Sequence, residues 1–415
     1  MITPDRITLE HRQPKVLHGV DTLQRLDNPA VISTTIPVFL VIATLGADKT
    51  QAGTTIPIAS LLLGALVMIS SFVRPIRGLL RPNWGVWLTL AIPIWMAITT
   101  ALNGVNGTKR VVNIGMEALL ILVISSGRVC VISIARGAAV AVIAGTAWAY
   151  ATFSRSSYPG RLTGGWGDPN NAGMCILALG AIAIAYSRTN RTRALIGIFC
   201  IVGVVGTLSR TSLFGLLIVG IWVTAGERIP TWIRLAVIGV LIWYVTTLPQ
   251  SDFTAGAFAG REGSDALRQR IDEAAQASVQ IHPLTGNGAG TAQTTVQGET
   301  FFFHNSYEAL RAEGGWILLG LVVLLITLSL FALLRLPREY RNRWVEASLI
   351  GPLVCAISLG EVFLAPPVML AVGVALRHIA VSRRRMNGGL SDPESVNQDA
   401  DLSQQIVWSD KLAHA

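Results

Sequence analysis

The chain has 415 residues, of which 51% are apolar and 14% are charged, and its formal net charge is +9. A soluble domain typically carries roughly 25% charged residues, so this composition argues against a soluble enzyme. A disordered chain would be richer in charge and poorer in aliphatic residues. Because one membrane span needs about 20 apolar residues, the composition predicts an all-α integral membrane protein with about twelve spans.

The basic residues are distributed as in membrane proteins. Most arginines fall between apolar runs instead of clustering on one basic face, so we expect no nucleic-acid partner. The cysteines lie in or beside apolar runs and show no CxxC spacing. We therefore expect them to be buried hydrophobic side chains and not metal ligands or disulfide partners. They are Cys130, Cys175, Cys200 and Cys355.

Twelve apolar runs are predicted to form transmembrane helices. Nine fall within residues 29–248 and three within 314–380, and the fifth could begin before Arg136. The polar segments 1–28 and 381–415 are expected to be tails, the second of them disordered, and the first lacks the pattern of a signal peptide. The runs are 30–46, 55–73, 84–102, 111–126, 137–153, 170–187, 194–208, 212–225, 233–248, 314–334, 346–360 and 363–380.

The cationic residues also indicate the topology. If the N-terminus is cytoplasmic and the runs alternate, 22 of the 33 Lys and Arg residues lie on the cytoplasmic side and ten lie outside, with Arg136 ambiguous. This bias agrees with the positive-inside rule and predicts that both termini are cytoplasmic.

One connection, 249–313, is far longer than the others and lies on the predicted outer side. Loops of this length in compact proteins are usually functional or disordered. Within it, 264–281 has the apolar spacing of a helix, with Ser264 as the cap and His282-Pro283 as the stop. The apolar face comprises Leu267, Ile271, Ala274 and Ala275. The Gly-rich segment LTGNGAGT predicts a turn after this helix.

Cations on the predicted outer side form the first group of candidate residues. Arg210 lies between two apolar runs with almost no polar loop around it, so its charge needs an anionic partner. Arg161 lies in the preceding outer loop, and Arg268 and Arg270 lie on the predicted loop helix. Because guanidinium binds phosphate oxygens in a bidentate manner, several converging arginines could hold a diphosphate without a metal.

His304 is the second candidate. A neutral imidazole can accept a proton from a hydroxyl group or orient it, and Asn305, Tyr307 and Glu308 are polar neighbours. The sequence contains no metal-ligand cluster and no nucleotide-binding glycine pattern. Ionisable residues within the predicted spans are few, namely Glu117, Arg136 and Glu361. This scarcity disfavours an ion-coupled transporter.

Three motif blocks lie in order and on the same predicted side of the membrane. The first is GRLTGGWGDPNNAG at 160–173, and the second is TLSRTSLFG at 207–215. The third comprises Arg268, Pro283, Leu284, Gly286, Gly288, His304, Asn305, Tyr307, Glu313 and Gly315. With these blocks the chain resembles the O-antigen ligase and polymerase family of bacterial membrane glycosyltransferases. The resemblance covers about 30–380. The chain departs from the family pattern at Glu308, where Leu is usual, and at Asp272, where an aromatic residue is common.

The resemblance implies an activity and a set of partners. Members of the family transfer a glycan from an undecaprenyl-diphosphate carrier to an acceptor hydroxyl at the outer face of the bacterial inner membrane. The anomeric centre is inverted, and no metal, nucleotide sugar or cofactor is needed. The implied partners are the lipid-linked donor, a glycan, lipid or protein acceptor, and membrane lipid.

The resemblance also implies residue roles. Arg210 and Arg268 match positions that hold the diphosphate, and His304 matches the residue that activates or orients the acceptor, so these three are the predicted catalytic residues. The predicted substrate-binding residues are Arg161, Arg270, Asn305 and Tyr307.

Three alternatives stay open. A polymerase of the same family would use a second lipid-linked glycan as the acceptor. A multi-span transporter would depend on Glu117 or Glu361 and would tolerate the loss of His304. A membrane scaffold would be indifferent to both Arg210 and His304.

Overall fold

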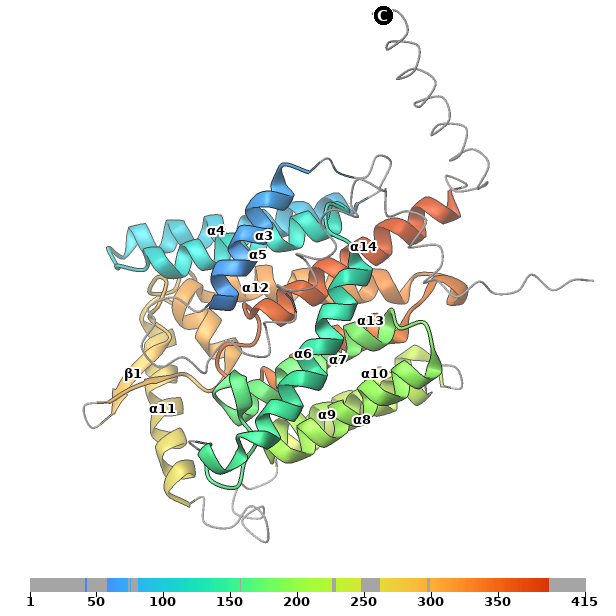
Figure 1. The fold of residues 1–415 in the computed structure, drawn as a ribbon. Coiled ribbons are helices and arrows are strands. Elements are labelled where there is room, and N and C mark those ends of the chain that lie inside the picture. The colour runs from blue at the N-terminus through green and yellow to red at the C-terminus, as the bar shows by residue number, and fades with distance from the viewer. Residues whose placement is uncertain are drawn as a thin grey trace, which may run out of the picture.

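The structure is a computed structural model of the chain. It describes residues 42, 58–73, 75, 81–156, 158–225, 229–247, 262–296 and 299–387. The described residues are mostly helical, with twelve α-helices and one two-stranded antiparallel hairpin (Figure 1). The predicted helical class is therefore confirmed.

The helices follow one another through short connections, except between α6 and α7 and between α10 and α12. They are α3 (Ile58–Ser71), α4 (Asn83–Leu102), α5 (Thr108–Ser125), α6 (Val131–Ala151), α7 (Pro169–Ala185), α8 (Asn190–Thr207), α9 (Arg210–Thr224), α10 (Thr231–Thr247), α11 (Glu262–Ile281), α12 (Ser306–Leu334), α13 (Arg343–Cys355) and α14 (Pro366–Met386). The shorter elements are η3 (Phe153–Arg155), η4 (Gly164–Trp166), β1 (Gln293–Val296), β2 (Glu299–Phe302) and η8 (Arg338–Tyr340).

Eleven of the twelve predicted apolar runs coincide with a helix. The first run, 30–46, lies outside the described residues apart from Ile42. Within the described ranges, four helices are long and apolar enough to cross a membrane, namely α4, α6, α8 and α12. α7, α9 and part of α3 are shorter apolar helices. α6 begins at Val131, so Arg136 lies inside the helix, where its side chain is exposed.

Two predicted boundaries are wrong. α14 continues to Met386, so the segment from 381 to 386 is helical instead of part of a disordered tail. α11 begins at Glu262, so Ser264 lies within the helix and is not its cap. The predicted tail 1–28, and the C-terminal segment after Asn387, lie outside the described residues.

Side-chain caps fix where several helices begin. Asp168, Thr189, Ser209, Asn305 and Asn342 each accept a hydrogen bond from a backbone amide in the first turn of the helix that follows. Such caps accept hydrogen bonds from amides that would otherwise lack a partner. Loss of one cap lowers the stability of the protein by about 1 kcal/mol. The helix starts that border the candidate site are therefore set by local sequence.

α7 is the central helix, and every residue in it except Asn170 and Asn171 is buried. It packs against α6, α8, α9 and α13, while α4, α5, α12 and α14 pack beside one another. Small residues permit close approach, as is common between membrane helices. A Cβ atom on Gly180 would lie only 2.2 Å from Sγ of Cys200. All four cysteines are buried, as predicted.

A second, smaller core lies at one end of the bundle, which we call the α11 end. There α11 and the hairpin pack against the start of α12 (Figure 1). Ile271, Ala275 and Val279 of α11 are buried against Phe303 and Ala309. The apolar face predicted from sequence is thus the packing face. The hairpin, in which Gln293 pairs with Phe302, was not predicted.

Candidate functional site

Arg161 joins the start of α7 to the end of α8. Its Nε donates a hydrogen bond to the carbonyl oxygen of Thr207 (3.0 Å), and its Nη2 donates to Oδ1 of Asn170 (3.2 Å). The amide of Leu162 also donates to the carbonyl of Gly206 (2.9 Å). The glycine-rich loop that carries Arg161 is therefore fastened onto the α8–α9 turn.

Arg210 is the first residue of α9, directly after that turn. Leu208 has a positive φ of 47°, and Ser209 caps α9 by accepting from the amide of Ser212 (3.3 Å). The Ser212 hydroxyl in turn reaches the carbonyl of Asn170 (3.5 Å). Arg161 is hydrogen-bonded to Thr207, which precedes Arg210 by three residues. The structure therefore brings the two arginines to one junction of α7, α8 and α9.

His304 lies half-buried in the segment that leads into α12. The next residues are fixed to the connection between α13 and α14. The Ser306 amide donates to the carbonyl of Ala356 (2.9 Å), and the Ser306 hydroxyl donates to the carbonyl of Leu359. A Cβ atom on Gly360 would collide with the Phe303 carbonyl, so this position requires glycine. These contacts hold the backbone around His304 in one place.

The neighbours of His304 have structural partners. Oδ1 of Asn305 accepts from the amides of Tyr307 (2.9 Å) and Glu308 (3.4 Å), which caps α12. The Tyr307 hydroxyl donates to the carbonyl of Leu353 (3.3 Å), and its ring packs edge-on against Phe363. Their assignment to substrate binding stays a prediction, and both also stabilise the start of α12.

The Arg210 and His304 segments lie at the same end of the bundle. A Cβ atom on Gly215 in α9 would lie 3.4 Å from Sγ of Cys355, the last residue of α13. The residue after it, Ala356, holds Ser306. The end of α13 therefore connects α9, which begins with Arg210, to the segment that carries His304.

Both arginines predicted on the loop helix lie in α11, but the structure describes only one of the two side chains. Arg268 is a residue of α11, and its side chain is not among those that the structure describes. Arg270 is exposed. On the neighbouring face, Asp272 acts electrostatically on Glu308 of α12, so the two residues at which the chain departs from the family pattern are neighbours.

The most extensive polar contact at this end was not predicted. Arg110, near the start of α5, forms ion pairs with Glu313 (Nε to Oε1, 3.3 Å) and with Glu361 (Nη1 to Oε1, 3.4 Å). The Glu313 side chain is 3% exposed, whereas that of Glu361 is 55% exposed. Glu361 lies in the α13–α14 connection, so the prediction that it lies within a membrane span is wrong.

Glu313 lies at a break in α12. Gly315 has φ 67° and ψ −166°, which interrupts the helix. The predicted turn after α11 fills this break, with the Asn287 amide donating to the carbonyl of Ala312 (2.7 Å) and the Trp316 amide donating to the carbonyl of Pro283 (2.9 Å). Interrupted helices are tolerated at membrane depth only where the freed backbone groups find such partners.

The same turn holds the Glu313 carboxylate. The Gly290 amide donates to its Oε1 (2.8 Å), and Gly286, Gly288 and Gly290 all have positive φ. A Cβ atom on Gly286 would lie 2.4 Å from the Gly314 nitrogen. The glycines therefore permit a tight turn against α12, as the sequence predicted, and also deliver a backbone donor to a buried carboxylate.

Arg110 could have been found from the sequence. It is a cation on the predicted outer side, directly before an apolar run, and the argument that such a cation needs an anionic partner applies to it as it does to Arg210. Its partners could not be found, because Glu313 lies 203 residues away in the chain.

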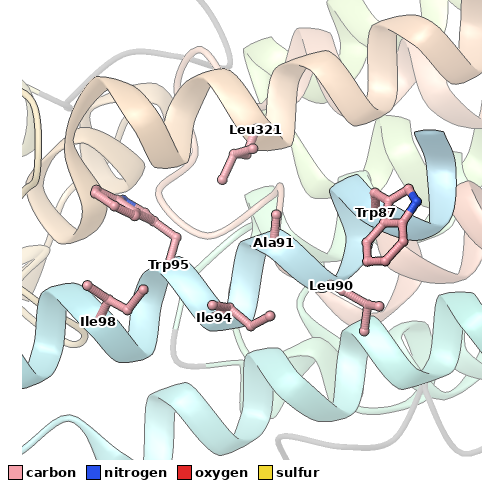
Figure 2. A pocket seen from close by; sticks show the side chains of 7 residues that line it. All are labelled: Trp87, Leu90, Ala91, Ile94, Trp95, Ile98 and Leu321. Atoms are coloured by element: carbon pink, nitrogen blue, oxygen red, sulfur yellow. The ribbon is translucent and has the colours of Figure 1, made fainter.

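An apolar groove of about 310 Å³ lies between α4 and α12 (Figure 2). It ends near the break in α12, because Trp95 in its lining donates from Nε1 to the Gly314 carbonyl (2.8 Å). The lining residues are Trp87, Leu90, Ala91, Ile94, Trp95, Ile98 and Leu321. Its apolar lining suits a hydrocarbon chain.

Among the described residues, no group of three or more His, Cys, Asp or Glu side chains could hold a metal ion. The chain matches no protein-family model and no curated protein.

Proposed function

We propose that this protein is a membrane glycosyltransferase that transfers a glycan from undecaprenyl diphosphate to an acceptor hydroxyl. The supporting observation is that Arg161, Arg210 and the His304 segment gather at one end of the bundle, around the end of α13. The proposal includes a twelve-span protein of the bacterial inner membrane with both termini in the cytoplasm.

The proposed reaction needs two kinds of protein group. The acceptor oxygen forms a bond to the anomeric carbon, the bond from that carbon to the diphosphate breaks, and the diphosphate leaves with the electron pair. Arg210, together with Arg161 and Arg268, stabilises this negative charge. The imidazole of His304 accepts the hydroxyl proton. Attack from the side opposite the diphosphate inverts the anomeric centre.

A reconstitution with lipid-linked oligosaccharide and a panel of acceptors, with a chelator present, tests the proposal. We expect the wild type to release undecaprenyl diphosphate and to transfer the glycan. Arg210→Ala and His304→Ala should each lower the rate at least about a hundredfold. Matched controls are Arg155→Ala and His282→Ala, which remove exposed residues of the same types at the same end. The proposal fails if the site variants and their controls behave alike.

The product separates ligase from polymerase. Glycan on a chemically different acceptor identifies a ligase, and a longer glycan on the lipid carrier identifies a polymerase.

A transporter is the second candidate, and the break in α12 favours it. Broken helices with ionisable residues beside the break are typical of transporter binding sites. Here Arg110 binds Glu313 next to the break, and the buried Glu117 lies within electrostatic reach of Arg110. This function predicts solute flux that is lost in Glu117→Gln and retained in His304→Ala, which is the reverse of the enzyme's dependence.

A further inference from the structure

α12 carries an arginine stacked on an aromatic ring at each end of its apolar stretch. The Cζ atom of Arg311 lies 4.1 Å from the centroid of the Trp316 ring, and the Cζ atom of Arg335 lies 4.3 Å from the centroid of the Phe331 ring. Both aromatic residues are exposed. Aromatic rings gather at the two interfaces of a bilayer, where a long cationic side chain can cover apolar surface while its charge reaches the headgroups.

The length of helix between these two pairs fits a membrane. From the break at Gly315 to its last residue, Leu334, α12 has about 20 residues, which extend about 30 Å and match a hydrocarbon core of roughly 30 Å. α12 is also the most apolar of the four candidate spans within the described ranges. Trp316 therefore marks the level of one membrane interface, at the α11 end of the bundle.

The turn that follows α11 lies at the level of Trp316. The Trp316 amide donates a hydrogen bond to the carbonyl of Pro283 (2.9 Å), and the Ile317 amide donates to the carbonyl of Leu284 (3.4 Å). The contact is close, because a Cβ atom on Gly315 would lie 2.1 Å from the Leu284 carbonyl. Backbone hydrogen bonds thus hold the turn against the first residues of the apolar stretch.

This turn exposes large apolar side chains, although it belongs to the segment predicted to lie outside the membrane. Ile281 is 65% exposed and Leu284 is 64% exposed. Leu102, the last residue of α4, is also exposed, and the residue after it, Asn103, donates from Nδ2 to the carbonyl of Gly286 (3.2 Å). Apolar side chains grouped in this way on a surface mark a contact with a membrane or a partner, and here they adjoin the apolar surface of α12.

We propose that the turn from Ile281 to Leu284 is seated in the interface of the bilayer leaflet at the α11 end. Its partner is the phospholipid of that leaflet, whose acyl chains cover the Ile281 and Leu284 side chains. The turn then fixes the C-terminal end of α11 at the membrane surface. The proposal rests on α12 crossing a membrane and does not depend on the proposed glycan transfer.

Spin labels on the full-length protein in nanodiscs of phosphatidylcholine and phosphatidylglycerol measure the depth of the turn. One label at a time is attached to Leu284→Cys, Leu324→Cys or Glu273→Cys, and the wild type, whose four cysteines are buried, gives the background. Power saturation compares collisions with oxygen, which concentrates in lipid, and with a water-soluble nickel chelate. Leu324 is exposed on α12 and serves as the lipid control, whereas Glu273 is exposed on α11 and serves as the water control.

We expect oxygen to relax the labels of Leu284→Cys and Leu324→Cys more strongly than the nickel chelate does, and the order to reverse for Glu273→Cys. If the Leu284→Cys label follows the water control instead, the turn lies in water and the proposal is wrong. A Leu324→Cys label that is open to the nickel chelate would remove α12 from the bilayer and would overturn the proposal as well. If Leu284→Cys does not fold, the label of Ile281→Cys must follow the lipid control. None of these outcomes depends on glycan transfer, so the two proposals fail separately.

Discussion

Arg110 and Glu313 lie 203 residues apart in the chain, yet Nε of the arginine is 3.3 Å from Oε1 of the glutamate. The same oxygen accepts a hydrogen bond from the Gly290 amide (2.8 Å). One buried carboxylate thus joins α5, the break in α12 and the glycine turn after α11. Through Glu361, Arg110 also reaches the connection that holds the segment around His304.

We expect Arg110→Ala to lower the free energy of unfolding by about 3 kcal/mol, because it leaves the Glu313 carboxylate buried without its cation. Glu313→Gln should cost less, since a neutral amide is easier to bury. Unfolding in detergent, followed by circular dichroism, measures both. Arg270→Ala, at an exposed position, should change stability by less than about 0.5 kcal/mol. Equal effects of the three substitutions would contradict this account of the ion pair.

Gly315→Ala should be strongly destabilising. The residue has φ 67°, and an added Cβ atom would lie 2.1 Å from the carbonyl carbon and oxygen of Leu284. Gly320→Ala is the matched control, because it lies in the same helix and its Cβ atom would meet no atom within 4 Å. Alanine at that position should stabilise the helix by up to about 1 kcal/mol. Thermal unfolding midpoints that move in the same direction would show that the break is not required.

Substitutions of Asn305 can separate capping from substrate binding. Asn305→Ala should cost about 1 kcal/mol, since it removes the acceptor for the amides of Tyr307 and Glu308. Asn305→Asp keeps that acceptor and should retain stability. If the side-chain NH2 group contacts the acceptor substrate, Asn305→Asp should still raise the KM for that substrate. An unchanged KM would limit Asn305 to its structural role.

Arg161→Lys should loosen the glycine-rich loop although the charge is kept. Lysine cannot reproduce the two directions in which Nε and Nη2 donate to Thr207 and Asn170. Faster hydrogen exchange is expected at the Leu162 amide, which bonds to the Gly206 carbonyl. Exchange should stay unchanged in Arg155→Lys, which alters an exposed arginine nearby. Equal exchange in both variants would contradict the anchoring role of Arg161.

Much of the helical arrangement could be predicted because its causes are local. The length of an apolar run and the cap before it set each helix, so the run 170–187 became Pro169–Ala185, with Asp168 as its cap. The loop helix could be predicted from the spacing of Leu267, Ile271 and Ala275, because that spacing places them on one face. α14 extends past its apolar run, since its terminal arginines are good helix formers.

The candidate site was predictable in part. The sequence identified Arg210 because it lies between two apolar runs, and it identified Arg161 and His304 because they lie in predicted outer loops. It did not reveal that Asn305 and Tyr307 also bond to the backbone, or that Gly286 and Gly290 serve a break in another helix. The hairpin was also missed, since its register depends on the α11 core against which it packs.

The sequence by itself determined the helical class, the apolar segments and the residue types available for chemistry, because composition, periodicity and caps act over a few residues. Only the tertiary structure decided which charges meet. Arg110 of α5 binds Glu313 of α12 and Glu361 of the α13–α14 connection. These pairings depend on how helices distant in the chain pack, and sequence spacing carries no record of that packing.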